Sequence, residues 1–487
     1  MIAIFVLAVT VRLVGVLRGG GLYARGNYDD GVHFAAAMGL VNGLLPYRDF
    51  MLLHPPGVVL ILAPFALLSW LIGEPDAVAV ARLSWMVLGG VNAVLCGLVL
   101  RPISRLAGLV AALYYALSLG AIYVEHTTLL EPPATTLLLI ALVLTRLLGS
   151  DDGIRTRHYV IAGLLLGLSP VLKIWGVVAI LVVVGGIGFR RAWRPALITL
   201  GAAAASCAAA CLPFFLAAPV EMWKMVVVAQ LGRRRASERV ADRLTDVLGT
   251  REWTGVSLTW NHWLTATSVV LLAALVICLI RVELRVIAAL MITHGVLVMT
   301  TPMWFLHYAG LTSAPIALTL GGALAVVMGW TAGIRWLPPT LAAIAGALVL
   351  ILAVPMTRLD LGRPFPGQAL AAAVSDQQGC LTTDWPMASL QMDHMQKDLD
   401  RGCPFVVDLG GYTYYLSDSS YSDVSRRKNQ DWQALALEYY RSGEAVLPIR
   451  FSTEAGFSKE TAKTIAGWPE LARVGRYVVR EPQPAGG

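Results

Sequence analysis

The sequence predicts a polytopic α-helical membrane protein that ends in a water-soluble α/β domain. Of its 487 residues, 57% are hydrophobic and only 14% are charged, whereas soluble domains carry about 25% charged residues. The charges gather between apolar runs of roughly 15 to 22 residues, and about 20 apolar residues span a bilayer. These two observations exclude a soluble enzyme, a nucleic-acid-binding module and a disordered scaffold. The net charge of +7 therefore reflects loop topology and lipid phosphates.

Eleven membrane crossings are predicted from the apolar runs. A longer run over 159–189 would reach about 46 Å as one helix, against a hydrocarbon core of about 30 Å. We therefore expect two spans there, with Lys173 at the turn. No small-residue cleavage site follows the first run, so we expect no cleavable signal peptide. The other nine crossings are the runs 1–17, 84–100, 106–124, 134–148, 196–217, 264–280, 286–302, 309–330 and 337–355.

Residues 57–72 are apolar, but their path is ambiguous. A full crossing would place Arg101 and Arg105 on the opposite side from the basic loops at 146–157 and 190–194. A re-entrant or interfacial helix keeps all three regions cytoplasmic, as the positive-inside tendency prefers.

The loop 218–262 falls outside in this topology although it is rich in basic residues. Either the topology changes after residue 173, or these side chains stay outside because they bind an anion, which we favour. The basic residues are Lys224, Arg233, Arg234, Arg235, Arg239, Arg243 and Arg251.

The composition changes at about residue 356, which divides a membrane domain (1–355) from a soluble domain (356–487). In the latter, short strand-like runs (CPFVVDLGG, RYVVRE) alternate with helical patterns such as WQALALEYYRSG. Eleven crossings from a cytoplasmic N-terminus place this domain outside. An exported compartment would let its two cysteines, Cys380 and Cys403, form a disulfide. We see no Walker-type Gly–Lys loop, which argues against ATP-driven pumping by this chain alone.

Residues 27–57 contain the largest concentration of ionisable side chains that could take part in a reaction. Asp29 and Asp30 are adjacent at the mouth of a membrane helix, an amphipathic stretch follows that suits an interfacial helix, and Asp49 and His54 come after it. One aspartate could simply cap the helix that begins near residue 31. Ionisable groups near hydrocarbon are costly and tend to be functional, and a carboxylate here could act as a general base on an acceptor hydroxyl.

The runs Y-D-D-G-V-H, G-L-L-P-Y-R-D-F and H-P-P-G in this loop resemble the first external loop of the GT-C glycosyltransferases. The nearest branch contains the protein O-mannosyltransferases and the lipid A aminoarabinose transferases. The resemblance covers roughly 1–355 and implies a sugar donor carried on polyprenyl monophosphate. It also implies that Asp29 is the catalytic base, with Asp30 in place of a more usual glutamate, and that His54 belongs to an H-P-P motif.

Two further candidates follow from the same resemblance. Glu131 precedes a proline at a helix start and resembles the acidic residue of the second external loop, although a helix N-terminus also stabilises a carboxylate by itself. Lys173 resembles a lysine near the lipid phosphate, although a snorkelling lysine would look the same in sequence. Glu125 and His126 are either further candidates or a simple interfacial pair.

Arginines and aromatic residues supply the remaining candidates. Arg233, Arg234 and Arg235 lie in a stretch that could form a helix, and guanidinium forks match phosphate oxygens. A solvated or lipid-facing stretch is the alternative. His307 and Tyr308 resemble an element near the lipid-carrier groove of these transferases, or they belong to an interfacial aromatic belt.

Together these residues predict an inverting transfer at the outer face of the plasma membrane. A sugar, with mannose or arabinofuranose favoured, moves from polyprenyl monophosphate to a hydroxyl of a cell-envelope glycan or lipoglycan. We expect no metal site and no cofactor, because the donor is itself a lipid-linked sugar. One alternative is a transporter or flippase of a lipid-linked intermediate, and a second is a non-enzymatic envelope protein. Asp384, Asp408 and the tyrosines Tyr412, Tyr414 and Tyr415 of the soluble domain either contact glycan or pack in the core.

Overall fold

The computed structural model describes residues 1–487 except 150–152, 234–237, 254–257, 416–424 and 485–487. The chain forms two compact units, each built from three separate stretches. The first unit comprises Met1–Arg18, Arg82–Cys211 and Arg235–Leu361, and the second comprises Gly19–Ala81, Leu212–Arg234 and Gly362–Gly487. The loop after the first helix therefore belongs to the same unit as the C-terminal residues.

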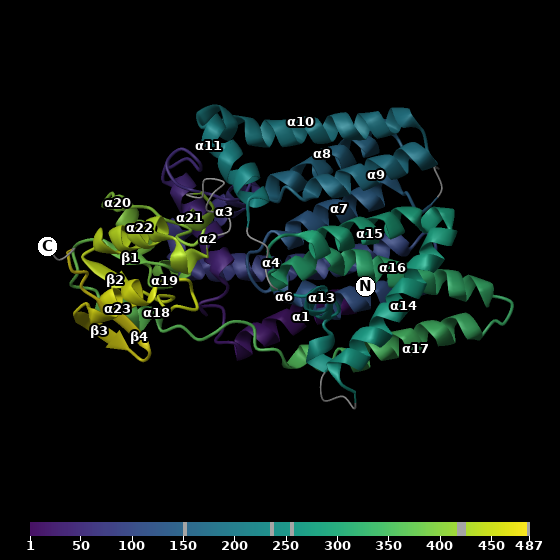
Figure 1. The fold of residues 1–487 in the computed structure, drawn as a ribbon. Coiled ribbons are helices and arrows are strands. Elements are labelled where there is room, and N and C mark those ends of the chain that lie inside the picture. The colour runs from purple at the N-terminus through teal and green to yellow at the C-terminus, as the bar shows by residue number, and fades with distance from the viewer. Residues whose placement is uncertain (150–152, 234–237, 254–257, 416–424, 485–487) are drawn as a thin grey trace. The chain divides into compact units, whose positions relative to one another are not determined.

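The first unit is helical (Figure 1). Two helices, α4 (Glu74–Leu100) and α10 (Trp193–Ala217), contain boundaries between the units. The other helices of this unit are α1 (Ile2–Arg18), α5 (Arg105–Leu117), α6 (Leu119–Glu125), α7 (Glu131–Thr145), α8 (Thr156–Leu172), α9 (Gly176–Arg190), α13 (Val240–Leu248), η2 (Thr250–Trp253), α14 (Trp260–Ile280), η3 (Val282–Leu284), α15 (Arg285–Thr300), η4 (Leu306–Ala309), α16 (Gly310–Trp330), α17 (Leu337–Leu352) and η5 (Met356–Arg358).

The helices indicate an integral membrane protein, as predicted. Among the described residues, six helices are long and apolar enough to cross a membrane, and the pair α5–α6, bent by 57°, makes a seventh if it is one span. The helices α3 (Gly57–Ile72), α7, α8 and α9 are apolar but shorter. The number of eleven crossings and the path of 57–72 stay predictions.

The predicted break at Lys173 is confirmed. Helix α8 ends at Leu172 and α9 begins at Gly176, so the apolar run forms two helices that pack side by side (Figure 1). Lys173 occupies the C-cap of α8 with an extended backbone, φ −149° and ψ 127°.

A buried ion pair crosses the interior of the first unit. The Nε atom of Arg12 donates to Oε2 of Glu125 at 2.7 Å, and both side chains are fully buried. Tyr115 and Asn92 donate to the other oxygen, Oε1, at 2.6 and 3.1 Å. Glu125 is therefore a structural partner of Arg12 rather than half of an interfacial pair with His126, whose Nδ1 lies 2.6 Å from the carbonyl oxygen of Tyr123.

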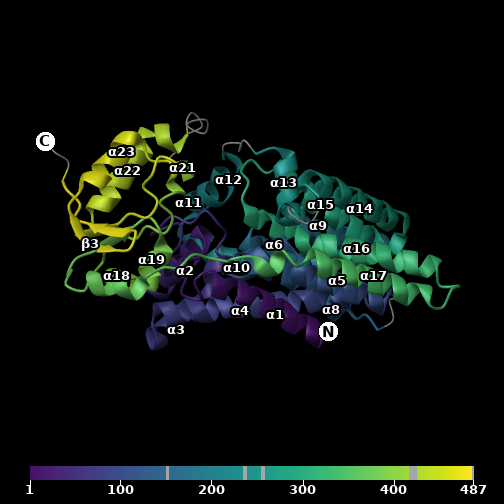
Figure 2. The ribbon, with the colours of Figure 1, turned by 90° about the horizontal axis from the view of Figure 1, so that it is seen from below.

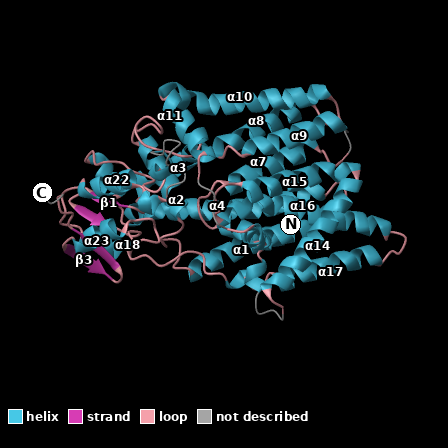
Figure 3. Cartoon of the chain, viewed as in Figure 1, coloured by secondary structure: helices cyan, strands magenta, loops and turns pink. Residues whose placement is uncertain are grey.

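The second unit contains a four-stranded sheet in the order β1–β2–β4–β3 (Figure 3). Strands β1 (Leu381–Thr383) and β2 (Ala445–Leu447) are parallel, and β4 (Tyr477–Arg480) pairs antiparallel with β2 and with β3 (Glu470–Val474). Its helices are α2 (Tyr28–Val41), α3, α11 (Pro219–Trp223), the π-helix η1 (Lys224–Val228), α12 (Ala229–Leu231), α18 (Gly367–Ala373), α19 (Pro386–Gln391), α20 (Met395–Asp400), α21 (Tyr412–Tyr415), η6 (Arg426–Lys428), α22 (Gln430–Arg441) and α23 (Lys459–Gly467).

Helices cover both faces of the sheet. Figure 2 shows α22 and α23 on one face, with α18 and α19 on the other. The core on the first face contains Trp432 and Tyr440 from α22, Val446 from β2 and Ile465 from α23. The sequence patterns WQALALEYYRSG and RYVVRE are thus confirmed as a helix and a strand.

The run CPFVVDLGG (403–411) was predicted as a strand, and this was wrong. No described residue of the run is in a strand, because side chains and a disulfide hold it as a loop. Cys403 forms a disulfide with Cys380, the pair expected from the sequence. At the other end, the indole Nε1 of Trp432 donates to the carbonyl oxygen of Leu409 at 2.8 Å.

Helix α2 is buried on every side rather than amphipathic. Ten consecutive residues, Asp30 to Gly39, are buried, because α3 and α19 both pack against the helix. Gly31 permits the close approach of α19, since a Cβ atom at this position would lie 2.7 Å from the backbone nitrogen of Met387. The sequence suggested an interfacial helix because one of the covering helices, α19, lies more than 300 residues further along the chain.

His394, the N-cap residue of α20, and Asp398 within this helix give a pH-dependent prediction. Burial raises the pKa of Asp398 to about 6 and, with Lys397 and Arg401, lowers the pKa of His394 to about 4. In the unfolded chain these values are about 3.9 and 6.5. The stabilising contribution of Asp398 is therefore present at low pH and is lost as the pH rises to about 6. That of His394 is present above about 6.5 and is lost as the pH falls towards 4.

These two contributions oppose each other in the wild-type protein. We expect Asp398→Asn to make the melting temperature fall more steeply than in wild type between pH 6.5 and 4, and His394→Gln to make it fall less steeply. Thermal denaturation of the full-length protein in detergent, followed by tryptophan fluorescence at several pH values, measures both slopes. Parallel profiles for all three proteins would contradict the assignment.

Candidate functional site

The paired aspartates lie in the first turn of α2. Asn27 holds the N-cap position, so neither Asp29 nor Asp30 is the cap that the simpler interpretation required. Asp30 is fully buried, and Asp29 is half-buried. A carboxylate at this position lies at the positive end of the helix dipole.

A third carboxylate, Asp408, lies near this turn. The hydroxyl of Tyr28 donates to Oδ1 of Asp408 at 2.9 Å, and the backbone nitrogen of Gly410 donates to the Tyr28 hydroxyl oxygen at 3.2 Å. Burial raises the pKa of Asp408, and the nearby charge of Asp29 raises it further. The sequence indicated either a glycan contact or a core position for Asp408, and its contact with Tyr28 was not foreseen because 380 residues separate the two.

His54 lies next to a histidine that the sequence analysis did not select. The rings of His54 and His33 are 5.4 Å apart in an edge-to-face arrangement. His33 is 2% exposed and follows Asp29 by one helical turn, and this four-residue spacing was the available signal. The loop is held by Tyr47, whose hydroxyl donates to the carbonyl oxygen of His54 at 2.7 Å.

Asp49 has a local structural role. Both of its carboxylate oxygens accept hydrogen bonds from Arg48, at 2.9 and 2.8 Å, and Oδ2 also accepts from the backbone nitrogen of Leu45 at 2.7 Å. The hydrogen bonds from Arg48 and Leu45 lower the pKa of Asp49. We therefore give it no part in the chemistry proposed below.

The arginine-rich stretch could form a helix, but its described residues Arg233, Glu238 and Arg239 lie outside helices. Helix α12 ends at Leu231 and α13 begins at Val240. The guanidinium carbon of Arg233 lies 5.0 Å from the ring centre of Tyr414, which is a cation–π distance. Arg234 and Arg235 lie outside the described residues.

Part of the basic character of the 218–262 loop is structural. Arg243, on α13, donates to the carbonyl oxygens of Met299 and Thr301 at 3.2 and 2.7 Å. A cation at this position satisfies and neutralises the C-terminal end of α15. Arg239 pairs with Asp242 at 3.1 Å. The contacts of Arg243 and Arg239 within the protein explain the presence of these two charges, so a bound anion is not needed for them.

In the first unit, two predicted site residues meet directly. The Nζ atom of Lys173 lies 2.7 Å from Oε1 of Glu131, and both side chains are buried. The ammonium also lies 4.5 and 4.2 Å from the ring centres of Trp175 and Tyr308. Lys173 does not snorkel, because its charge is held by a carboxylate and two aromatic faces.

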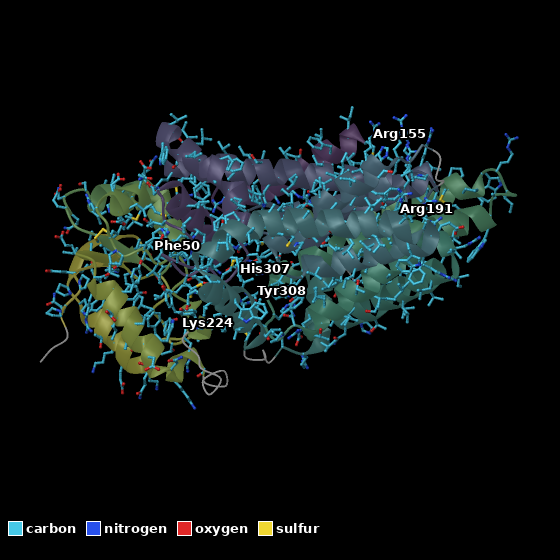
Figure 4. The ribbon with its side chains drawn as sticks, turned by 90° about the horizontal axis from the view of Figure 1, so that it is seen from above. Phe50, Arg155, Arg191, Lys224, His307 and Tyr308 are labelled. Atoms are coloured by element: carbon cyan, nitrogen blue, oxygen red, sulfur yellow. A yellow bond between two sulfur atoms is a disulfide. The ribbon has the colours of Figure 1, made fainter. Side chains whose placement is uncertain are left out.

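His307 and Tyr308 complete this cluster. Their rings are 4.6 Å apart, and His307 lies close enough to Glu131 to interact with its charge. Figure 4 shows both residues at one end of the helices, with Arg155 and Arg191 at the other end. Arg191 donates to the carbonyl oxygens of Arg146 and Gly149 at 2.8 and 2.9 Å, so two of the predicted cytoplasmic loops lie together, away from the cluster.

The first unit thus presents a lysine and a histidine at one end, and the second presents carboxylates at the start of a buried helix. The lysine and the histidine can neutralise an anion, and the carboxylates can accept a proton. Among the described residues, no group of three or more His, Cys, Asp or Glu side chains could hold a metal ion.

Comparison with known proteins gives one family match. The model of glycosyltransferase family 87 matches residues 52–302, which is just over half of the chain. No curated protein matches the sequence significantly.

Solved structures with similar folds include ArnT from Cupriavidus metallidurans in the apo state. Its TM-score is 0.62 at 13% identity, over 99% of this chain and 97% of that one. The same protein bound to undecaprenyl phosphate gives 0.59 at 14% identity, over 99% and 98%. An oligosaccharyltransferase from Archaeoglobus fulgidus gives 0.58 at 12% identity, over 95% and 70%. These likenesses show that the chain has the predicted GT-C fold.

A double-mutant cycle tests the Lys173–Glu131 pair. Lys173→Gln leaves the Glu131 carboxylate buried without its cation, and removing one partner of a buried pair costs about 3 to 5 kcal/mol of unfolding free energy. We expect Lys173→Gln/Glu131→Gln to recover part of that loss. Thermal denaturation of the single and double variants in detergent measures the coupling, and purely additive losses would show that the pair contributes nothing.

Proposed function

Because the chain belongs to glycosyltransferase family 87, we propose that it transfers a sugar from polyprenyl monophosphate to an acceptor hydroxyl. The acceptor is a cell-envelope glycan or lipoglycan, and the reaction takes place at the outer face of the plasma membrane. The sugar is mannose or arabinofuranose. The observation that carries the proposal is the pair of aspartates in the first turn of α2, within a chain of the GT-C fold.

Asp29 is the general base in this proposal. It is half-buried at a helix N-terminus, which leaves part of the carboxylate accessible to an acceptor. Asp29 accepts the proton of the acceptor hydroxyl, and the resulting oxygen nucleophile attacks the anomeric carbon. The bond from this carbon to the carrier phosphate breaks, so a single displacement inverts the anomeric configuration. Asp30 is fully buried, so it is less accessible to an acceptor than Asp29.

Lys173 and His307 stabilise the leaving phosphate. The bond to Glu131 holds the ammonium of Lys173 in a fixed position at 2.7 Å, and fixed charges stabilise a developing anion better than mobile ones. ArnT, which has a similar fold, was solved with undecaprenyl phosphate, and this supports a polyprenyl phosphate carrier. Arg233 provides a further guanidinium for phosphate oxygens. No step of this proposal uses a metal ion.

Transfer assays with aspartate variants test the base. Purified protein in nanodiscs would receive radiolabelled polyprenyl-phosphate mannose or arabinose with a panel of envelope glycan acceptors. We expect Asp29→Asn to lower the rate by about 10²- to 10⁴-fold, the usual contribution of a general base, while donor binding persists. Asp30→Asn should lower it less.

Asp431→Asn is the matched control, because Asp431 also lies in the first turn of a helix, α22, and is exposed. Its rate should equal that of wild type. An Asp29→Asn variant that stays folded and fully active would remove Asp29 from the chemistry. Uptake of the donor lipid without transfer to any acceptor would instead favour a carrier-handling function.

A further inference from the structure

A cavity in the second unit is lined by four arginines. Its volume is about 450 Å³, and Arg25, Arg363, Arg450 and Arg476 all line it. Arg25 comes from the loop after the first helix, and the other three come from the C-terminal residues. Glu454 is the one acidic residue among those that line the cavity, so four positive charges face a single negative one.

None of these four arginines forms a salt bridge within the described part of the chain, whereas arginines elsewhere do, such as Arg473 with Glu470 at 2.6 Å. The Nε atom of Arg25 is buried and hydrogen bonds to no described residue. Burial lowers the pKa of Arg25, and the charges of Arg476 and Arg363 add to this effect. Asp384 interacts electrostatically with Arg25 and Arg450 and offsets part of this positive charge. An anion bound between the arginines would relieve the remaining repulsion.

Aromatic side chains link the cavity to the candidate base. The guanidinium of Arg450 stacks over the rings of Tyr28 and Trp385, at 5.1 and 5.5 Å from their centres. Tyr28 directly precedes Asp29, so a ligand on Arg450 lies near the start of α2. The guanidinium carbon of Arg25 also lies over the ring of Trp385, 4.2 Å from its centre. The two guanidinium groups are therefore held in place by aromatic faces.

The chemistry of the lining identifies the ligand class. Guanidinium forks bind phosphate oxygens in pairs, and a volume of about 450 Å³ is within the usual range for small-molecule sites. The aromatic side chains Phe451 and Tyr477 also line the cavity and provide apolar surface for a sugar ring. A free phosphate ion would use the arginines but not these rings.

We propose that this cavity binds a phosphate-bearing sugar of the acceptor and thereby directs the acceptor hydroxyl to Asp29. The inference rests on the proposed function and extends it, because it specifies an anionic acceptor and separates its phosphate from that of the donor. Arg25, Arg363, Arg450 and Arg476 act as binding residues, and none of them takes part in proton transfer.

Direct binding measurements test this cavity without requiring transfer. Isothermal titration of the full-length protein in non-ionic detergent would use mannose 6-phosphate, inorganic phosphate and mannose as probes. We expect mannose 6-phosphate to bind at least tenfold more tightly than either of the others. Arg363→Gln and Arg476→Gln, both at exposed positions, should each weaken its binding at least tenfold.

Arg401→Gln is the control, because Arg401 is an exposed arginine of the same unit that does not line the cavity. It should bind mannose 6-phosphate as wild type does. Undecaprenyl phosphate, titrated into the same samples, should bind the cavity variants and wild type equally. Equal affinity for inorganic phosphate and mannose 6-phosphate, or unchanged binding in both cavity variants, would overturn the assignment. If the wild-type protein failed to bind undecaprenyl phosphate, this would count against the proposed donor. The result for mannose 6-phosphate in the cavity would still be valid.

Discussion

The ion pair between Lys173 and Glu131 is the interaction on which the proposed chemistry of the first unit depends. Its two charges lie 2.7 Å apart in a buried environment, where an isolated charge would be strongly disfavoured. The pair fixes the turn between α8 and α9 to the start of α7, and Tyr308 and Trp175 cover the ammonium. A lysine held in this way is a preorganised cation. Its backbone nitrogen donates to the carbonyl oxygen of Ser169 at 3.0 Å, and its carbonyl oxygen accepts from the backbone nitrogen of Gly176 at 2.8 Å, so the turn itself is also held in place. The Arg12–Glu125 pair follows the same rule deeper in the unit, but its acceptors are all satisfied, which suits a structural role.

The second unit depends on a different constraint, the packing of the segment after the first helix against residues that lie more than 300 positions later in the chain. Helix α2 is covered on one side by α3 and on another by α19, and the hydrogen bond from Tyr28 to Asp408 joins its first turn to the loop 403–411. The C-terminal residues therefore shape the surroundings of the candidate base. They also supply three of the four arginines in the cavity beside Tyr28. The acceptor specificity of the enzyme would then be encoded mainly after residue 361.

Local sequence patterns predicted the elements that are determined locally. The apolar runs gave the helices, the single lysine within 159–189 gave the break between α8 and α9, and the two cysteines outside the apolar runs gave the disulfide. Contacts between distant residues could not be predicted in this way. Arg12 and Glu125 are 113 residues apart, and Tyr28 and Asp408 are 380 apart. The run CPFVVDLGG has the composition of a strand, yet its disulfide and the indole of Trp432 fix it as a loop. Arg243 was grouped with the anion-binding residues of the loop 218–262, because a sequence does not reveal that the end of α15 lies beside it.

A structure of the protein with bound undecaprenyl phosphate would test the central claim most directly. Electron cryo-microscopy in nanodiscs, at a resolution that shows the phosphate, would locate the group relative to Lys173. The account predicts that the phosphate lies within hydrogen-bonding distance of the Lys173 ammonium, next to His307, while Glu131 keeps its contact with the lysine. A phosphate bound away from Lys173 and His307, with the Lys173–Glu131 pair unchanged, would contradict the assignment of this cluster to the leaving group.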